Sequence, residues 1–319
     1  MVNEKIDLPH QGGRLFLTDS GLETSLIFHD GMDLPHFASF TLLKTAEGRA
    51  RLSRYFARHA EIAAAHGTGF VWESATWRAS SDWGDKLGYS ARLLADANRD
   101  SIELMREVAA DFRMPQVFSG NIGPRGDGYI ADGAMSVREA TDYHAPQVAT
   151  FAKAGCDMVS AFTMTNTHEA IGVVRAATAH DICCVISFTV ETDGRLPSGE
   201  GLRDAIQRTD AETDAYPAYY MINCAHTSHF MNVLEPEAAW LDRISGLRAN
   251  ASARSHEELN ESSDLDAGDP VALSGDYAAL LTKLAKLRVL GGCCGTDTHH
   301  VAEIAKACVS PDGRKSVAA

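Results

Sequence analysis

The sequence predicts one closed (β/α)8 barrel of the TIM type that spans residues 1–319 as a single domain. Short apolar runs alternate with longer helix-forming stretches eight times, which is the pattern of βα units around a parallel sheet. Apolar residues make up 45% and charged residues 23% of the chain, so it can bury a sizeable core. The length of 319 residues suits a barrel with extensions, because single barrels commonly reach about 250 residues or more.

Eight apolar runs are expected to form the barrel strands, since strands of a parallel sheet contain nearly continuous apolar residues. The seventh run gives the weakest signal. Connections between parallel strands are right-handed, so the strands should follow one another around the barrel in sequence order. Strands six and eight are then separated by one strand. The eight predicted strands are 14–19, 68–74, 116–121, 157–162, 183–189, 219–224, 246–250 and 289–294.

Helices are expected between these strands, where residues with high helix propensity accumulate, as in the alanine-rich segment 61–65. Each helix should return the chain to the start of the next strand. The carboxyl ends of all eight strands then converge on one face, where the active sites of this fold lie. The predicted helices are 45–66, 91–112, 136–154, 168–178, 201–208, 235–244, 271–287 and 299–309.

Residues 251–269 differ from the rest of the chain because they are rich in Ser, Asn, Glu and Asp. We expect this segment to be a long loop after strand seven, on the face that carries the active site. Two interpretations stay open, a solvated acidic excursion and a lid that closes over a substrate.

The charge balance excludes two kinds of partner. The net charge is −14 without clustered Lys or Arg, which argues against nucleic acid and against an anionic membrane surface. The amino terminus lacks the apolar segment of a signal peptide, and no run of 18 or more apolar residues occurs, so we expect a cytoplasmic protein. Seven cysteines, an odd number, suit metal binding or reduced thiols better than a disulfide framework.

The strongest chemical signal is a pair of adjacent cysteines, Cys293 and Cys294, that ends the eighth apolar run within a glycine-rich segment. A disulfide between neighbours is strained, because their Cα atoms lie about 3.8 Å apart against a usual 5.5–6 Å. Two thiolates can instead bind one soft cation. Cys224, which ends the sixth run, is the best third ligand. Three sulfurs leave one position of a zinc ion open, as in catalytic zinc sites.

The same residue types also have plain structural interpretations. Free cysteines are often buried, so Cys293 and Cys294 could be inert core thiols, although their glycine neighbours leave little core to fill. A second pair, Cys183 and Cys184, lies in the body of a strand and is expected to fill the core. The same is expected of Cys156 and Cys308. Four histidines that follow the cysteine motifs could supply a fourth ligand but are expected to be solvated or to cap helices: His226, His229, His299 and His300.

Four segments together resemble the homocysteine S-methyltransferase family, barrel enzymes that move a methyl group from a sulfonium or ammonium donor to a thiol. They are 17–24, 119–124, 222–224 and 291–295. The resemblance implies that Cys224, Cys293 and Cys294 hold Zn²⁺ and that the acceptor thiol takes the fourth position. It also implies roles for residues that end other strands, namely Asp19 and Glu23 near the amino-acid part of the acceptor, and Ser74, Trp77 and Asn121 in the substrate site.

The chain departs from the family at strand four. Where the family usually has a glutamate for the substrate ammonium group, Phe162 stands here, followed by Thr163. The loss of that carboxylate removes a charge-assisted hydrogen bond of roughly 1.5–3 kcal/mol. Either Glu73 replaces it, or the acceptor lacks the amino group. Trp77 and Trp83 could contact an onium donor through cation–π interactions, or they could simply pack.

These observations predict a zinc-dependent S-methyltransferase. The expected acceptor is homocysteine, giving methionine, or a related thiol, and the expected donor is a small sulfonium such as S-methylmethionine or a quaternary ammonium such as betaine. One alternative is a zinc hydrolase, which coordination by thiolates alone disfavours. Another is a zinc-bound thiol sensor without turnover. The expected partners are small molecules, and the sequence leaves monomer and homodimer open.

Overall fold

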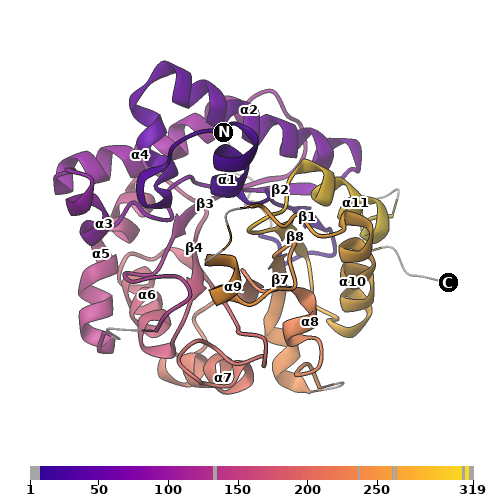
Figure 1. Cartoon of the computed structure of the whole chain (residues 1–319). Coiled ribbons are helices and arrows are strands. Elements are labelled where there is room, and N and C mark those ends of the chain that lie inside the picture. The colour runs from indigo at the N-terminus through magenta and orange to yellow at the C-terminus, as the bar shows by residue number, and fades with distance from the viewer. Residues whose placement is uncertain are drawn as a thin grey trace, which may run out of the picture.

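The computed structural model describes residues 8–131, 135–235, 238–260, 262, 264–310 and 313–315. Eight parallel strands close into one barrel in sequence order, with helices around the outside (Figure 1). The predicted (β/α)8 barrel is confirmed. The strands are β1 (Phe16–Leu17), β2 (Gly69–Glu73), β3 (Gln116–Ile122), β4 (Met158–Met164), β5 (Cys183–Phe188), β6 (Tyr219–Asn223), β7 (Ile244–Ala249) and β8 (Val289–Gly292).

Long helices follow most strands, and shorter helical turns lie in the connections between them. The α-helices are α1 (Leu22–Thr24), α2 (Ala46–Ala65), α3 (Ser81–Lys86), α4 (Ala91–Ala109), α5 (Val137–Lys153), α6 (Thr167–Ala179), α7 (Leu202–Glu212), α8 (Thr227–Phe230), α9 (His256–Asn260), α10 (Pro270–Lys283) and α11 (Thr298–Cys308). A π-helix, η1 (Ser25–His29), and three 3₁₀ helices complete the described elements: η2 (Pro35–Phe37), η3 (Ser39–Lys44) and η4 (Ala239–Arg243).

The starts of the long helices are fixed by polar side chains. Thr45, Ser90 and Asn166 each accept a hydrogen bond from a backbone N–H in the first turn of α2, α4 and α6. Ser136 does the same for α5, where Glu139 reciprocates to form a capping box. Each such cap satisfies an N–H group that otherwise lacks a partner and contributes about 1 kcal/mol. These local signals explain why the predicted starts of the long helices agree closely with the structure.

The core has two layers, because side chains of each strand point alternately inward and outward. In β2, Val71 belongs to the cluster inside the barrel, whereas Phe70 and Trp72 belong to the cluster between strands and helices. Phe162, near the end of β4, belongs to the inner cluster. It therefore closes the barrel interior beneath the carboxyl ends of the strands.

Two details of the predicted elements were wrong. The helix expected at 235–244 does not form among the described residues of that range: 239–243 make the 3₁₀ helix η4, Ile244 begins β7, and 236–237 lie outside the described residues. Strand β8 ends at Gly292, so Cys293 and Cys294 follow the strand instead of ending it. Among the described residues, no helix combines the length and apolar character that a membrane crossing needs.

Candidate metal centre and substrate cavity

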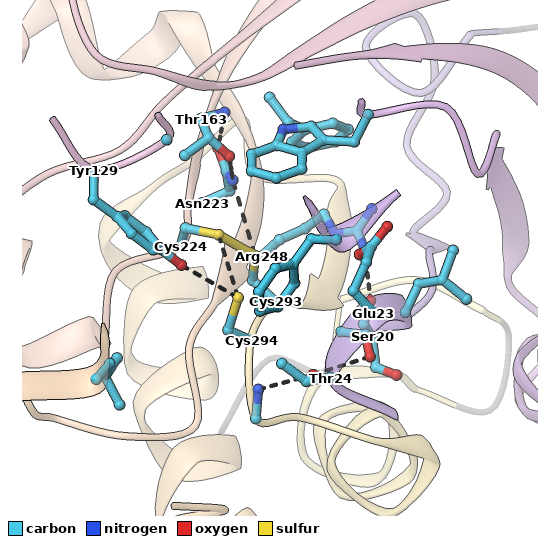
Figure 2. Close-up of a pocket in the computed structure, with 18 of the residues that line it drawn as sticks. Ser20, Glu23, Thr24, Tyr129, Thr163, Asn223, Cys224, Arg248, Cys293 and Cys294 are labelled. Carbon is cyan, nitrogen blue, oxygen red and sulfur yellow. Dashed lines mark hydrogen bonds between the residues drawn. A yellow bond between two sulfur atoms is a disulfide. The ribbon is translucent and has the colours of Figure 1, made fainter. Parts of the chain in front are cut away.

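A cavity of about 310 Å³ lies at the carboxyl ends of the strands, and a close-up of it is shown in Figure 2. Residues that follow different strands line it together, as expected of the active face of this fold. Ten residues that the sequence singled out as ligands or substrate contacts are among them: Asp19, Glu23, Ser74, Trp77, Asn121, Phe162, Thr163, Cys224, Cys293 and Cys294.

Three of these residues form a sulfur cluster. The Sγ atoms of Cys224, Cys293 and Cys294 all lie within 4.8 Å of one another, although Cys224 follows β6 and the other two follow β8. Cys224 and Cys293, with Cα atoms 5.4 Å apart, are joined by a disulfide, drawn as the yellow bond in Figure 2. The thiolate is the form of cysteine that binds metals, so coordination by all three residues requires this pair in its reduced form.

The backbone that presents the sulfurs has unusual conformations. Cys224 has φ = 53°, in the left-handed region that costs a residue with a side chain about 1 kcal/mol or more. Its N–H donates to the Arg248 carbonyl at 3.2 Å, and its carbonyl accepts from His256 Nε2 at 2.6 Å. Gly295, directly after Cys294, has φ = 80°, a conformation that glycine adopts without strain. The strand ends thus turn sharply and direct the sulfurs into the cavity.

Polar groups surround the sulfur cluster. The Tyr129 hydroxyl lies 3.4 Å from Cys294 Sγ, and Asn223 Nδ2 lies 3.9 Å from Cys293 Sγ. Asn223 is itself fixed, because its Oδ1 accepts from the Thr163 N–H at 2.9 Å and its Nδ2 donates to Thr163 Oγ1 at 2.9 Å. Burial raises the pKa of the Cys294 thiol, and the Tyr129 hydroxyl opposes that shift.

The donor set fits a zinc ion with one open position. Three sulfurs are soft ligands, and within the described ranges no histidine, aspartate or glutamate joins their cluster. His229 and His300 instead bond to the carbonyls of Ala253 and Ala267 at 2.9 and 2.8 Å. His226 caps α8, and the His299 side chain is largely exposed. The fourth position would therefore face the cavity.

Beside the cluster lies a buried ion pair that the sequence did not predict. Arg248, in β7, places its guanidinium 3.0 Å from Asp19 Oδ1 and donates to the Gly292 carbonyl at 2.9 Å. The Tyr55 hydroxyl donates to Asp19 Oδ2 at 3.0 Å. Arg248 also lies 5.0 Å from the centre of the Phe162 ring. The carboxylate of Asp19 is thus neutralised by the protein itself, and an aromatic ring covers a cation at the position where the family resemblance implied a glutamate.

Two further carboxyl groups face the cavity. Glu73 is 3% exposed, and its Oε1 accepts from Ser160 Oγ at 3.1 Å whereas its Oε2 has no partner within the described part of the chain. Burial raises the pKa of Glu73 from 4.5 to about 8, against the opposing charge of Arg248. Burial also raises the pKa of Glu23, whose carboxylate accepts from Ser39 Oγ at 2.7 Å.

The ring faces of Trp77 and Trp83 contact cations of the protein itself, which agrees with packing, one of the two interpretations that the sequence left open. Trp77 lines the cavity, but Trp83 is not among the lining residues. The guanidinium of Arg78 lies 4.0 Å from the Trp77 ring centre and 3.8 Å from that of Trp83. Lys86 Nζ also lies 3.9 Å from the Trp83 ring. The protein's own cations therefore occupy the ring faces that an onium donor would otherwise contact.

The long connection between β7 and α10 lies on the cavity side of the barrel, and its helix α9 is labelled near β7 in Figure 1. It contributes six lining residues: Ser252, Leu259, Ser262, Asp264, Leu265 and Asp266. His256 of α9 stacks on Tyr129 with ring centres 4.1 Å apart. The segment predicted at 251–269 thus forms part of the cavity wall and contacts the segment that carries Tyr129.

Sequence reasoning did not single out four residues of this site. Arg248 could have been noticed as a lone cation in an apolar strand, and Arg78 as a cation next to Trp77. Tyr55 and Tyr129 carry no local signal, because their contacts with Asp19 and Cys294 join segments far apart in the sequence.

A closed barrel whose active face presents three sulfurs to a cavity has the arrangement of an enzyme with a thiolate metal site. Residues 16–308 match the homocysteine S-methyltransferase family. The chain therefore belongs to the homocysteine S-methyltransferase family, and it is a methyltransferase.

Individual proteins are similar to this chain. Homocysteine S-methyltransferase YbgG of Bacillus subtilis (strain 168) is 26% identical over 240 residues, which are 68% of this chain and 74% of that protein. Crystal structures of the homocysteine methyltransferase MmuM from Escherichia coli share the fold. The match to the oxidized form has a TM-score of 0.70 at 20% identity and covers 93% of this chain and 97% of the MmuM chain. The match to the metallated form has a TM-score of 0.65 at 20% identity and covers 93% of this chain and 96% of the MmuM chain.

Proposed function

We propose that this protein is a zinc-dependent S-methyltransferase that moves a methyl group from a small sulfonium or quaternary ammonium donor to homocysteine, giving methionine, or to a related thiol. The family assignment supports a thiol acceptor. The observation that carries the proposal is the cluster of three cysteine sulfurs within 4.8 Å of one another on the wall of the cavity. Cys224, Cys293 and Cys294 are the residues that would hold the zinc ion.

Bound zinc would lower the pKa of a coordinated acceptor thiol, so that the thiolate is available near neutral pH. The transfer itself needs little acid–base help from the protein. The acceptor sulfur forms a bond to the methyl carbon while the bond from that carbon to the onium sulfur or nitrogen breaks, and the leaving group departs as a neutral thioether or tertiary amine. No proton moves in this step.

The chain's own residues would orient the reactants. Asn223 and Tyr129 approach two of the sulfurs and can donate hydrogen bonds to thiolates. Glu73 offers a carboxyl group with one unpaired oxygen for the ammonium group of homocysteine, in place of the glutamate that Phe162 replaces. Because the pKa of Glu73 is raised to about 8, an arriving ammonium group would favour its ionised form.

The test is methyl transfer by reduced, zinc-loaded protein, with homocysteine as acceptor and S-methylmethionine and glycine betaine as donors. Methionine would be followed by mass spectrometry. We expect methionine with at least one donor, and its loss in Cys294→Ala. Protein that holds zinc and yields no methylated thiol with any donor or thiol tested would contradict the proposal.

A further inference from the structure

Two buried arginines line the cavity, and their surroundings differ. Arg78 and Arg248 are each 6% exposed. Arg248 is paired with Asp19 at 3.0 Å. Arg78 has no carboxylate within 4.0 Å among the residues that the structure describes. The charge of Arg78 therefore has no ion-pair partner in the described part of the chain. A buried cation without a counter-ion costs several kcal/mol in desolvation.

The contacts of Arg78 fix its position without neutralising it. Its Nη1 donates to the Gly126 carbonyl at 2.8 Å, and its guanidinium is held between the rings of Trp77 and Trp83. Its Nε is buried and has no hydrogen-bond partner in the described part of the chain. Ring faces stabilise a cation by about 0.5–2 kcal/mol each, which holds the side chain in place but gives its Nε–H group no acceptor among the described residues.

The acidic residues around Arg78 do not form an ion pair with it. Asp127 and Glu23 act on its charge from beyond ion-pair distance, and Asp127 is exposed. Burial lowers the pKa of Arg78 to about 10, so the group remains protonated at neutral pH. Trp77 Nε1, beside it, is a second buried donor without a partner among the described residues. Unused donors around an unpaired cation suit an oxyanion, which accepts several charge-assisted hydrogen bonds.

We propose that Arg78 is the carboxylate-binding residue of the cavity and that it selects zwitterionic onium donors, such as betaines, over purely cationic ones. The inference rests on the proposed function and deepens it. A donor that carries only a positive charge would be repelled by Arg78. A betaine would pair its carboxylate with Arg78 and bring no net charge.

The position of Arg78 favours the donor as the source of the carboxylate. Arg78 follows β2 and bonds to the connection after β3, whereas Cys224 follows β6, which lies opposite β2 in an eight-stranded barrel. The acceptor sulfur is expected at the cysteines, and in-line attack requires the donor on its far side. The acceptor's own carboxylate is the second possible source, because homocysteine also carries this group.

The first experiment compares the wild type with Arg78→Met, using glycine betaine and choline as donors and homocysteine as acceptor. We expect kcat/KM with glycine betaine to fall roughly 10- to 100-fold in the variant, the effect of one charge-assisted hydrogen bond. The value with choline should not fall, because the unfavourable charge is removed as well. Arg78→Lys should keep part of the preference for glycine betaine. Arg125→Met, at an exposed arginine paired with Asp82, serves as the matched control without effect.

The second arm replaces homocysteine by 3-aminopropane-1-thiol, which lacks the carboxylate. A loss confined to glycine betaine supports the donor as the source. A loss confined to homocysteine would overturn the selection of donors by Arg78 and assign the bound carboxylate to the acceptor. Equal losses with every substrate pair, or no loss, would overturn the proposal, because a merely structural arginine does not distinguish substrates by charge. Thermal unfolding of each variant separates a folding defect from a loss of recognition.

A binding measurement keeps the proposal testable if no methyl transfer is found. Titration of the wild type with glycine betaine should change the intrinsic tryptophan fluorescence in a saturable way, because the guanidinium contacts Trp77 and Trp83. Choline should not reproduce the change, and Arg78→Met should abolish it. Such a result without turnover contradicts the proposed function but supports the carboxylate site. No saturable change in the wild type, in the absence of turnover, would contradict both.

Discussion

Two groups of three cysteines lie near opposite ends of the barrel strands, and the two groups have different surroundings. Cys156 precedes β4, and Cys183 and Cys184 begin β5, so all three lie near the amino ends of the strands. The other group, which follows β6 and β8, lies at the carboxyl ends. Both ends contain an adjacent pair. Only the group at the carboxyl ends brings its sulfurs within 4.8 Å of one another, as far as the described residues go.

The difference follows from the direction of the strands. Burial raises the pKa of the Cys156 thiol to about 12 and that of Cys183 to about 11. Cys184 points into the layer between strands and helices. Within a strand, neighbouring side chains point to opposite faces, so Cys183 and Cys184 cannot direct both sulfurs to one ion. Cys293 and Cys294 follow the strand, where a turn at Gly295 frees them from this alternation.

The largest expected effect is at the carboxyl end. Cys293→Ala should abolish stoichiometric zinc binding and reduce methyl transfer by about 1,000-fold or more, since two sulfurs cannot replace a three-sulfur site. Zinc content after dialysis, measured by elemental analysis, checks this. The matched control is Cys183→Ala, which should retain zinc. Equal zinc loss in both variants would break the comparison.

A second effect concerns the charge balance of the cavity. Glu73→Gln should stabilise the protein at pH 8 by roughly 2–4 kcal/mol and change little at pH 5. The sign follows from the raised pKa. Between pH 4.5 and about pH 8, Glu73 keeps its proton in the folded protein but loses it in the unfolded chain. The stability of the wild type therefore falls as the pH rises through this range. Urea unfolding at both pH values tests this, and an equal effect at both would contradict it.

At the amino end, Cys184→Ala should destabilise the protein by about 1–2 kcal/mol, because the side chain is fully buried in the core. Zinc content and kcat should stay at wild-type values. The free energy of unfolding and the zinc content of the same sample provide the measurement. Loss of zinc from this variant would show that the two ends are coupled.

The smallest effect is expected for Tyr129→Phe, which removes the hydroxyl 3.4 Å from Cys294 Sγ. The loss of one hydrogen bond to a thiolate should weaken zinc binding by about 3- to 10-fold. Competition with a chromogenic chelator measures this affinity directly. Tyr143→Phe, which alters a tyrosine bonded to Ser80 and outside the cavity lining, is the control. The hydroxyl has no role at the sulfurs if both variants bind zinc like the wild type.

The sequence predicted the barrel and its long helices because their signals are local: apolar runs, helix propensity and capping residues. The cysteine motifs were visible for the same reason, since strand ends in this fold always share one face. The short helices α1, α8 and α9 escaped prediction because they are only 3, 4 and 5 residues long and depend on tertiary contacts.

The charges of the cavity could not be predicted in the same way. Asp19 was expected to contact the acceptor, but whether its carboxylate is free depends on Arg248, a residue of another strand. The place of Arg78 between two aromatic rings likewise depends on how α3 packs. Pairing between distant segments decides which charges remain available, and one sequence does not contain that information locally.

The hydrogen bonds that close the barrel between its first and last strands constrain when the fold can form during synthesis. The Gly292 N–H bonds to the Asp19 carbonyl at 2.9 Å, and Arg248 bonds to the Ser20 carbonyl across a separation of 228 residues. A growing chain on the ribosome cannot make both contacts until residue 292 has emerged. Nascent chains shorter than this lack part of the sulfur cluster, so a metal ion could bind to all three sulfurs only after strands β1 to β8 have been synthesised.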